Sequence, residues 1–239
     1  MNKVISLAIN DLRNIFRDDI LKYFFLAVPL LFIIMLVFAV PVLISEFPIV
    51  ADYTSILISF FALEFPMIIG FVISFMMLVE KDERVFTALR VMPLSLFQFL
   101  FYRLFFSVFF TFIFVFIMLY LNNLYVLTIN QILISSFLFS LITPIVILME
   151  VCFAGNKVTG FTMFKGLNFI FMIPVASYFI TAKWKIAIGV IPSYWPMNTL
   201  YSFLNNQINY LEIVISALYS ILIIFILSII FKRKVYHLQ

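Results

Sequence analysis

Residues 79–95 read VEKDERVFTALRVMPLS and form a charged island in a strongly apolar chain. This stretch contains six of the 26 Asp, Glu, Lys and Arg residues in the 239-residue chain. Hydrophobic residues make up 66% of the chain, and long apolar runs flank the stretch on both sides. Such an alternation is typical of a membrane protein, whose charges lie in the connections between apolar spans.

The composition excludes a soluble protein. Charged residues account for 11% of the chain, against about 25% in a typical soluble domain. A folded chain of this size leaves much of its surface in contact with solvent, so that solvent must be lipid. The predicted fold class is an all-α integral membrane protein. The single cysteine, Cys152, excludes a disulfide within the chain, and the mixed charges of residues 2–22 predict no cleavable signal peptide.

Apolar runs of sufficient length predict the transmembrane helices. A helix needs roughly 20 apolar residues to cross a bilayer. The 46-residue uncharged run 104–149 is long enough for two helices, and the polar segment NNLYVLTINQ (122–131) divides it. We therefore predict a single transmembrane domain over residues 1–239. Its six spans are expected at about 22–45, 54–79, 97–121, 132–154, 162–181 and 210–231.

The distribution of basic residues predicts the orientation. With six spans, both termini lie on the same side of the membrane, and that side carries 13 of the 15 Lys and Arg residues. The other side carries only Lys183 and Lys185. Because short cytoplasmic loops are enriched in Lys and Arg, we expect a multi-pass plasma-membrane protein with both termini in the cytoplasm. The same bias accounts for the net charge of +4, so no nucleic-acid partner is expected.

An amphipathic helix is predicted at the N-terminus, at about residues 3–20. Its polar side carries Lys3, Arg13 and Arg17, which suit anionic headgroups at the cytoplasmic interface. The helix could anchor the chain at the membrane surface, contact a partner, or both. Its apolar residues recur at three- and four-residue steps: Ile5, Ala8, Ile9, Leu12, Phe16 and Ile20.

The segment before the last span, residues 182–207, is too polar to cross the membrane. Pro192 and Pro196 divide it, and its aromatic residues suit the membrane interface. One or two short outer helices are therefore expected before span six. Two interpretations remain open, a lid over the bundle and a substrate gate.

A short cytoplasmic helix is predicted at about residues 80–92, between spans two and three. Val85, Phe86, Leu89 and Met92 recur at helical spacing, and Pro93 ends the helix. A loop that only set the orientation would need the basic residues but not this apolar stripe. Nor would it need the acidic residues around it, since acidic residues contribute little to orientation. The pattern favours a helix that docks into a groove of a cytosolic partner.

This segment resembles the cytoplasmic loop of permease subunits of the type-2 ABC exporter family, which reads close to ERERGTLEQLLVTPVS. The corresponding residues are the charged run 80–84, Thr87-Ala88-Leu89 and Met92-Pro93-Leu94-Ser95. The family's glycine after the charged run is replaced here by Val85 or Phe86. The N-terminal interfacial helix, the six spans and the Pro-rich outer segment also match the family's layout.

The resemblance implies a half-transporter. A second permease subunit, identical or different, would complete the transporter, and a separate ATP-binding cassette ATPase would dock at the short helix. ATP and Mg²⁺ would bind to that ATPase, with no cofactor in this chain. The residues expected to couple the ATPase to the permease are Glu80, Asp82, Glu83, Arg84, Phe86, Leu89, Arg90 and Met92.

Residues for catalysis are lacking in the sequence. The closest approach to a phosphate-binding loop is 155–162, where Phe161 stands in place of the required lysine. One His and one Cys cannot form a metal cluster or a catalytic triad. We therefore expect no catalytic or metal site and no enzymatic activity, with ATP hydrolysis in the partner.

Two acidic residues fall inside predicted spans, where charges usually face the bundle interior. Glu64 could line a substrate pathway or pack helix against helix, and these alternatives stay open. Glu150 lies near the inner end of its span and is expected to reach water or Lys157.

The predicted function is export of an amphiphilic substrate, such as a drug, a peptide or a lipid-like molecule, driven by the separate ATPase. One alternative is a membrane-embedded enzyme that uses intramembrane carboxylates. Glu80 and Glu83 are the candidate pair, although both fit the short helix at 80–92 better. The other is a non-transporting scaffold that recruits a cytosolic complex.

Overall fold

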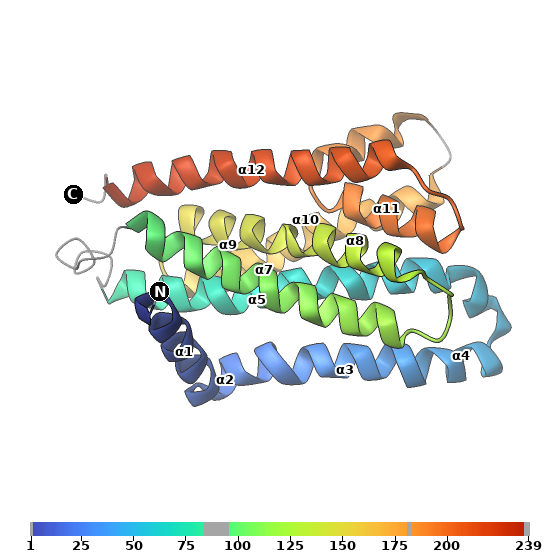
Figure 1. The fold of residues 1–239 in the computed structure, drawn as a ribbon, viewed down its shortest axis with the longest axis horizontal. Coiled ribbons are helices and arrows are strands. Elements are labelled where there is room, and N and C mark those ends of the chain that lie inside the picture. The colour runs from blue at the N-terminus through green and yellow to red at the C-terminus, as the bar shows by residue number, and fades with distance from the viewer. Residues whose placement is uncertain (1, 84–95, 181–182, 237–239) are drawn as a thin grey trace.

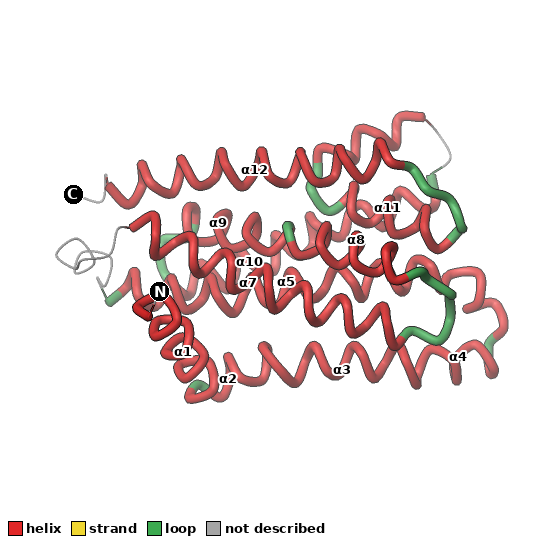
Figure 2. Tube along the Cα trace, viewed as in Figure 1, coloured by secondary structure: helices red, strands yellow, loops and turns green. Residues whose placement is uncertain are grey.

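The computed structural model describes residues 2–83, 96–180 and 183–236 (Figure 1). Helices connected by short loops make up these three segments, and no strand occurs in them (Figure 2). The α-helices are α1 (Asn2–Arg17), α2 (Asp19–Lys22), α3 (Val28–Ile34), α4 (Val40–Glu46), α5 (Thr54–Asp82), α7 (Leu96–Leu121), α8 (Ile129–Ser140), α9 (Ile142–Phe153), α10 (Lys157–Met172), α11 (Tyr194–Leu204) and α12 (Tyr210–Tyr236). The all-α prediction is confirmed.

Six helical segments of the described chain are long and apolar enough to cross a membrane, which confirms the predicted number of spans. Each contains at least 23 residues, more than the roughly 20 that a bilayer requires. They are Asp19–Glu46, Pro48–Asp82, Gln98–Leu121, Ile129–Phe153, Lys157–Phe179 and Tyr210–Lys234.

The first span is a continuous helix with two π-helical turns, Tyr23–Ala27 and Met35–Ala39. Each of these turns ends two residues before a proline, Pro29 or Pro41. Proline has no N–H to donate, and its ring displaces the carbonyl one turn earlier, so the helix widens there instead of ending. α1 crosses one end of the bundle at an angle to this span (Figure 1). Between them, the Asp18 carboxylate accepts hydrogen bonds from the first amides of α2.

The second and fourth spans form the centre of the bundle. In an 18-residue apolar window of each span, 83% and 78% of their residues are buried, against 22% and 17% in the first and sixth spans. α5 packs closely on α9 because Gly70 has no side chain. A Cβ at this position would lie 2.8 Å from Val146 Cγ1, and small residues permit such close approach in membrane bundles. The fourth span is interrupted at Leu141, between α8 and α9, three residues before Pro144.

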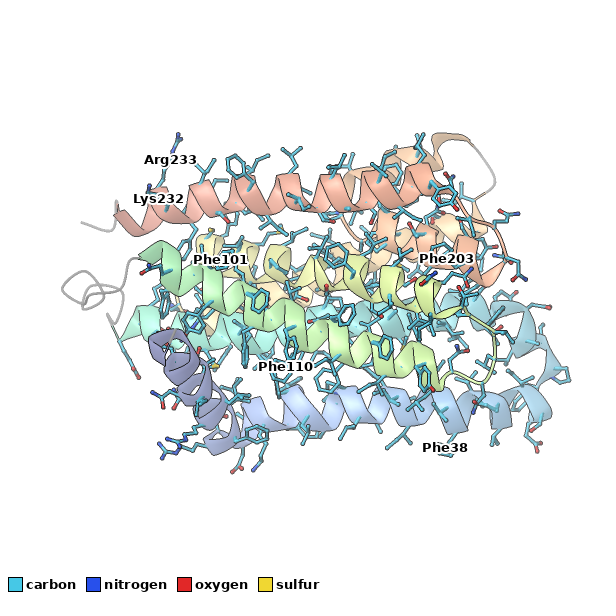
Figure 3. All side chains as sticks on the ribbon, in the orientation of Figure 1. Phe38, Phe101, Phe110, Phe203, Lys232 and Arg233 are labelled. Atoms are coloured by element: carbon cyan, nitrogen blue, oxygen red, sulfur yellow. The ribbon has the colours of Figure 1, made fainter. Side chains whose placement is uncertain are left out.

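Phenylalanine side chains fill much of the space between the outer spans and the centre. The Phe110 ring of α7 lies 5.1 Å from the Phe25 ring of the first span, on the side of α7 that faces α3 (Figure 3). Other rings on the same helix, such as Phe101, are more than half exposed. α7 therefore contributes aromatic side chains both to the bundle and to its lipid-facing surface.

Short helices precede the last span, as predicted. The 3₁₀ helix Lys183–Val190 and α11 form them, whereas the 3₁₀ helix Ile173–Phe179 is the last part of the fifth span. These short helices lie at the opposite end of the bundle from the two chain termini (Figure 1). We call the end with the termini the charged end, since Lys81, Arg103 and Lys234 gather there, and the opposite end the aromatic end.

One boundary differs from the prediction in a way that matters. The fifth span was expected to begin near residue 162, but α10 begins at Lys157. Asn156 caps it, its side chain accepting from the Thr159 amide while the Thr159 hydroxyl accepts from the Asn156 amide. Such a capping box satisfies two of the unpaired amides at a helix N-terminus and so favours a helix start at this position. Lys165 therefore lies eight residues from the start of the helix, and not three residues from the start of the predicted span.

Candidate functional site

The last turn of α5 contacts several other helices. Glu80, Lys81 and Asp82 are consecutive, so their side chains leave the helix about 100° apart. Each one meets a different neighbour. The chain leaves α5 at Glu83, directly before residues 84–95, which carry most of the predicted docking helix.

Glu80 forms an ion pair with Arg103 at the start of α7. Both Glu80 carboxylate oxygens accept hydrogen bonds from the guanidinium, at 2.5 Å each. The same guanidinium donates to both Asp11 oxygens on α1, at 3.1 Å each. Arg103 is 2% exposed and Asp11 is 5% exposed, so one buried cation joins α1, α5 and α7 through two carboxylates.

Two aromatic residues complete this ion cluster. The Tyr102 hydroxyl donates to Asp11 at 2.6 Å and accepts from Arg103 Nε at 3.1 Å. The Arg103 guanidinium lies 4.3 Å from the centre of the Phe99 ring. The contacts with two carboxylates, a hydroxyl and a ring face offset the cost of removing the Arg103 charge from water.

Lysines stabilise the C-terminus of α9. Lys81 Nζ donates to the carbonyl oxygens of Val151 and Ala154, at 3.3 and 2.8 Å. Lys234 Nζ, on α12, donates to the Cys152 carbonyl at 2.7 Å. The last carbonyls of a helix have no partner within it and carry partial negative charge, so two ammonium groups are favourable there.

Asp82 provides the opposite interaction at the start of α10. Its carboxylate accepts from the backbone N–H of Lys157 at 3.1 Å, and the first amides of a helix favour an anion. Together these contacts connect α1, α7, α9 and α10 to the end of α5, and Lys234 adds α12. We call the group Asp11, Glu80, Lys81, Asp82, Arg103 and Lys234 the charged-end network.

The structure places the predicted coupling residues in two groups. Glu80 and Asp82 contact other helices of the same chain, and Glu83 is exposed at the end of α5. The predicted docking helix was expected to begin at residue 80, but α5 extends through Asp82. The other predicted coupling residues lie outside the described part of the chain: Arg84, Phe86, Leu89, Arg90 and Met92.

The sequence analysis missed the partners of Arg103. Arg103 was counted only as an orientation signal, and Asp11 as part of an amphipathic helix. The available signal was the position of Arg103 inside an apolar span, since charges there nearly always pair with other groups.

The two acidic residues within the spans are both buried, and each contacts a different helix. Glu64 is 6% exposed, and one of its oxygens accepts from Asn168 Nδ2 on α10 at 3.4 Å. Its other oxygen is buried without a hydrogen-bond partner among the described residues. Glu150 is fully buried and accepts from the Ser74 hydroxyl at 2.5 Å. The prediction that Glu150 reaches water or Lys157 is therefore wrong, because its side chain is directed into the contact between α9 and α5.

Neither acidic residue belongs to a metal site. Over residues 2–83, 96–180 and 183–236, no three His, Cys, Asp or Glu side chains lie close enough to hold an ion.

A family model described as Fluoroquinolones export permease protein Rv2686c-like matches residues 11–228 of the chain. The chain belongs to this family. Two relatives, the fluoroquinolones export permease proteins MT2760 and Rv2686c, come from the CDC 1551 / Oshkosh and H37Rv strains of Mycobacterium tuberculosis. Each is 26% identical to this permease over 233 residues, which cover 94% of this chain and 92% of the relative. No solved structure matches the chain.

Membership of the Rv2686c-like export permeases agrees with the resemblance to type-2 ABC permeases that residues 80–95 predicted. The family match begins at Asp11, the residue bound to Arg103, and includes all six spans to within a few residues of the last helix end. Glu64, Asn168 and all of the charged-end network except Lys234 lie within it.

Proposed function

We propose that this permease is the membrane half of an ATP-driven exporter. A second copy, or a related subunit, completes the pathway, and an ATP-binding cassette ATPase docks at the charged end and binds the ATP and Mg²⁺. In this proposal the charged end faces the cytoplasm of the cell and the bundle lies in the plasma membrane, as the excess of Lys and Arg at that end favours.

The observation that carries the proposal is the charged-end network around the last turn of α5. Residues 83–95 connect α5 to α7, and Glu80 and Arg103 pair these two helices close to that connection. A force applied to the connection would act on α5 and α7 as one body, and through Asp11 and Lys81 on α1 and α9. Rigid-body displacement of packed helices is a common way to convert a local contact into a larger movement.

The relatives are named for fluoroquinolones, which are amphiphilic drugs, and we propose that this permease exports substrates of that kind. Glu64 would line the pathway. Glu64 and Glu150 each have one oxygen without a hydrogen-bond partner among the described residues, but only Glu64 contacts a polar side chain of an outer span, Asn168. This contact favours the role for Glu64, since an intramembrane ionisable residue is a candidate functional site.

The enzyme alternative needs two carboxylates that act together. Glu64 contacts α10, whereas Glu150 contacts α5 at Ser74. Ser74 lies ten residues beyond Glu64, or about 15 Å along α5. Paired carboxylate chemistry requires a much closer approach, about 5–10 Å in the glycosidases that use it. This separation favours transport over catalysis.

The proposal is tested by co-expressing the permease with the proteins encoded by its neighbouring genes and measuring transport in everted membrane vesicles. We expect ATP-dependent, vanadate-sensitive accumulation of a fluorescent fluoroquinolone. Co-purification of the ATPase with the detergent-solubilised permease should accompany it. A permease that brings down no ATPase and accumulates no drug would contradict the proposal.

Docking is tested by a triple variant, Glu83→Ala, Arg84→Ala and Leu89→Ala. It should insert normally but lose the vanadate-sensitive stimulation of the ATPase. The matched control is Glu46→Ala with Asp52→Ala, two acidic residues exposed at the aromatic end. Normal stimulation in the triple variant would place the docking site elsewhere.

A further inference from the structure

α10 carries a cation on the exposed side of a membrane-spanning helix. Lys165 lies eight residues from the start of α10, about 12 Å along its axis. Its side chain is exposed, and Nζ lies 4.7 Å from the centre of the Phe161 ring. A charged side chain at this depth usually faces a partner, a pathway or, by extending along the helix, the headgroups.

The buried carboxyl group of Glu64 lies next to the same stretch of α10. Asn168 follows Lys165 by three residues, so the two side chains lie on neighbouring positions of the helix surface. Asn168 is half-buried and donates to Glu64, while the second Glu64 oxygen has no partner among the described residues. α10 therefore carries an ammonium group about one turn from the amide that contacts the Glu64 carboxyl group.

Aromatic rings lie beside these polar groups. The Phe164 ring of α10 lies 4.6 Å from the Phe71 ring of α5, and the Phe161 ring lies 5.9 Å from it. Phe161 is 42% exposed and Phe164 is half-buried. This part of α10 thus offers ring faces as well as the two opposite charges.

We infer that Glu64, Asn168, Lys165, Phe161 and Phe164, which we call the α10 strip, recognise an aromatic zwitterion. The Glu64 carboxyl group receives the protonated amine of the substrate, Lys165 receives its carboxylate, and the phenylalanine rings contact its ring system. This inference rests on the proposed function and specifies its substrate class. A zwitterion suits the strip because each of its charges meets an opposite charge, whereas a purely cationic or anionic amphiphile leaves one of the two unpaired.

The test uses three probes that share one ring system and differ in which charged groups they carry. They are a fluoroquinolone with a free amine and a free carboxylate, its methyl ester, and its N-acetyl derivative. Glu64→Gln should reduce transport of the zwitterion and the ester about tenfold and leave the N-acetyl compound unchanged. Lys165→Gln should reduce transport of the zwitterion and the N-acetyl compound by a similar factor and leave the ester unchanged, as expected for the loss of one charge-assisted contact.

Matched controls separate recognition from general damage. Glu150→Gln changes the other buried acid within the spans, and Lys22→Gln changes a lysine near the start of another span. Neither should alter the discrimination between the three probes. Lys165→Arg keeps the cation and should retain transport of the N-acetyl compound.

Equal losses for all three probes in the two variants would overturn the inference, because they would indicate a packing role. A Lys165→Gln variant that transports all three probes normally would also overturn it, since Lys165 would then only extend toward the headgroups. Binding of each probe to the purified permease is measured separately, as a shift in melting temperature. This measurement distinguishes failure of the inference about the α10 strip from failure of the proposed function. Wild-type binding with the expected charge preference but without ATP-dependent transport would support the strip and contradict the exporter.

Discussion

The two ends of the bundle are stabilised by different chemistry. At the charged end, carboxylates, a guanidinium and lysines connect the helices. At the aromatic end, neutral side chains donate to backbone carbonyls. The Tyr178 hydroxyl donates to Met197, the Ser193 hydroxyl to Phe171 and the Trp195 indole N–H to Gly189, at 3.0, 2.7 and 2.8 Å.

This difference predicts how each end responds to a lost contact. Removal of one member of a buried charge cluster leaves the others charged and unpaired, which is much more costly than the loss of a neutral hydrogen bond. The ion cluster of Asp11, Glu80 and Arg103 should therefore behave as one unit, and the aromatic end as a set of separate contacts. A rigid unit of this kind suits the end where the ATPase is proposed to dock. Separate contacts at the aromatic end allow local rearrangement, which suits the end where a substrate is proposed to leave.

The largest effect is expected for Arg103→Ala. It leaves Asp11 and Glu80 without their shared cation, at a cost of about 3–5 kcal/mol. The measurement is the unfolding midpoint of the detergent-solubilised protein, followed by size-exclusion chromatography after heating. Loss of most of the folded protein is the expected result.

A charge-free cluster provides the control for this variant. Asp11→Leu, Glu80→Leu and Arg103→Met together remove all three charges and retain similar volumes. This triple variant should be more stable than Arg103→Ala, because buried ion pairs can be replaced by apolar groups at little cost. If both unfold at the same temperature, the unpaired charges are not the cause.

A smaller effect is expected for Lys81→Met. The Val151 and Ala154 carbonyls lose their ammonium donor, while Lys234 remains bound one position away at Cys152. Because Lys81 is only half-buried, we expect a loss of about 1 kcal/mol. Lys232→Met, at an exposed position that extends away from α12 (Figure 3), is the matched control. A drop equal to that of Arg103→Ala would show that the lysines belong to the same cooperative unit as the arginine.

At the aromatic end, Tyr178→Phe removes only the hydroxyl that donates to Met197. The expected loss is about 1 kcal/mol, the typical net value of one hydrogen bond. Combination with Ser193→Ala should give nearly the sum of the two single losses, read from the same unfolding midpoints. Strong non-additivity would contradict the description of this end as separate contacts.

The smallest effect is expected for Asp19→Asn at the charged end. Asp19 accepts from Lys22 at 2.7 Å, but it is largely exposed, and exposed ion pairs contribute little. The unfolding midpoint should not change measurably. A clear destabilisation would mean that charge at this end matters irrespective of burial, and the contrast between the two ends would then need another explanation.

The candidate site could be predicted only in part. An intramembrane Glu64 was recognisable as a special residue because a charge in an apolar span is rare. Its partner was not, since Asn168 lies 104 residues away in the sequence. Lys165 was counted only with the basic residues that set the orientation, because the predicted span began three residues before it, whereas the capping box starts α10 eight residues before it.

The sequence by itself determined the membrane class, the six spans, the N-terminal helix and the short helices before the last span. These depend on the length and period of apolar runs, which are local properties. Only the tertiary structure decided what the charges after Val79 contact. Successive side chains on a helix leave it in different directions, and which neighbour each one meets depends on helices packed from distant parts of the chain. Glu80, Lys81 and Asp82 therefore appeared as one charged stretch in the sequence, although they stabilise three different parts of the bundle.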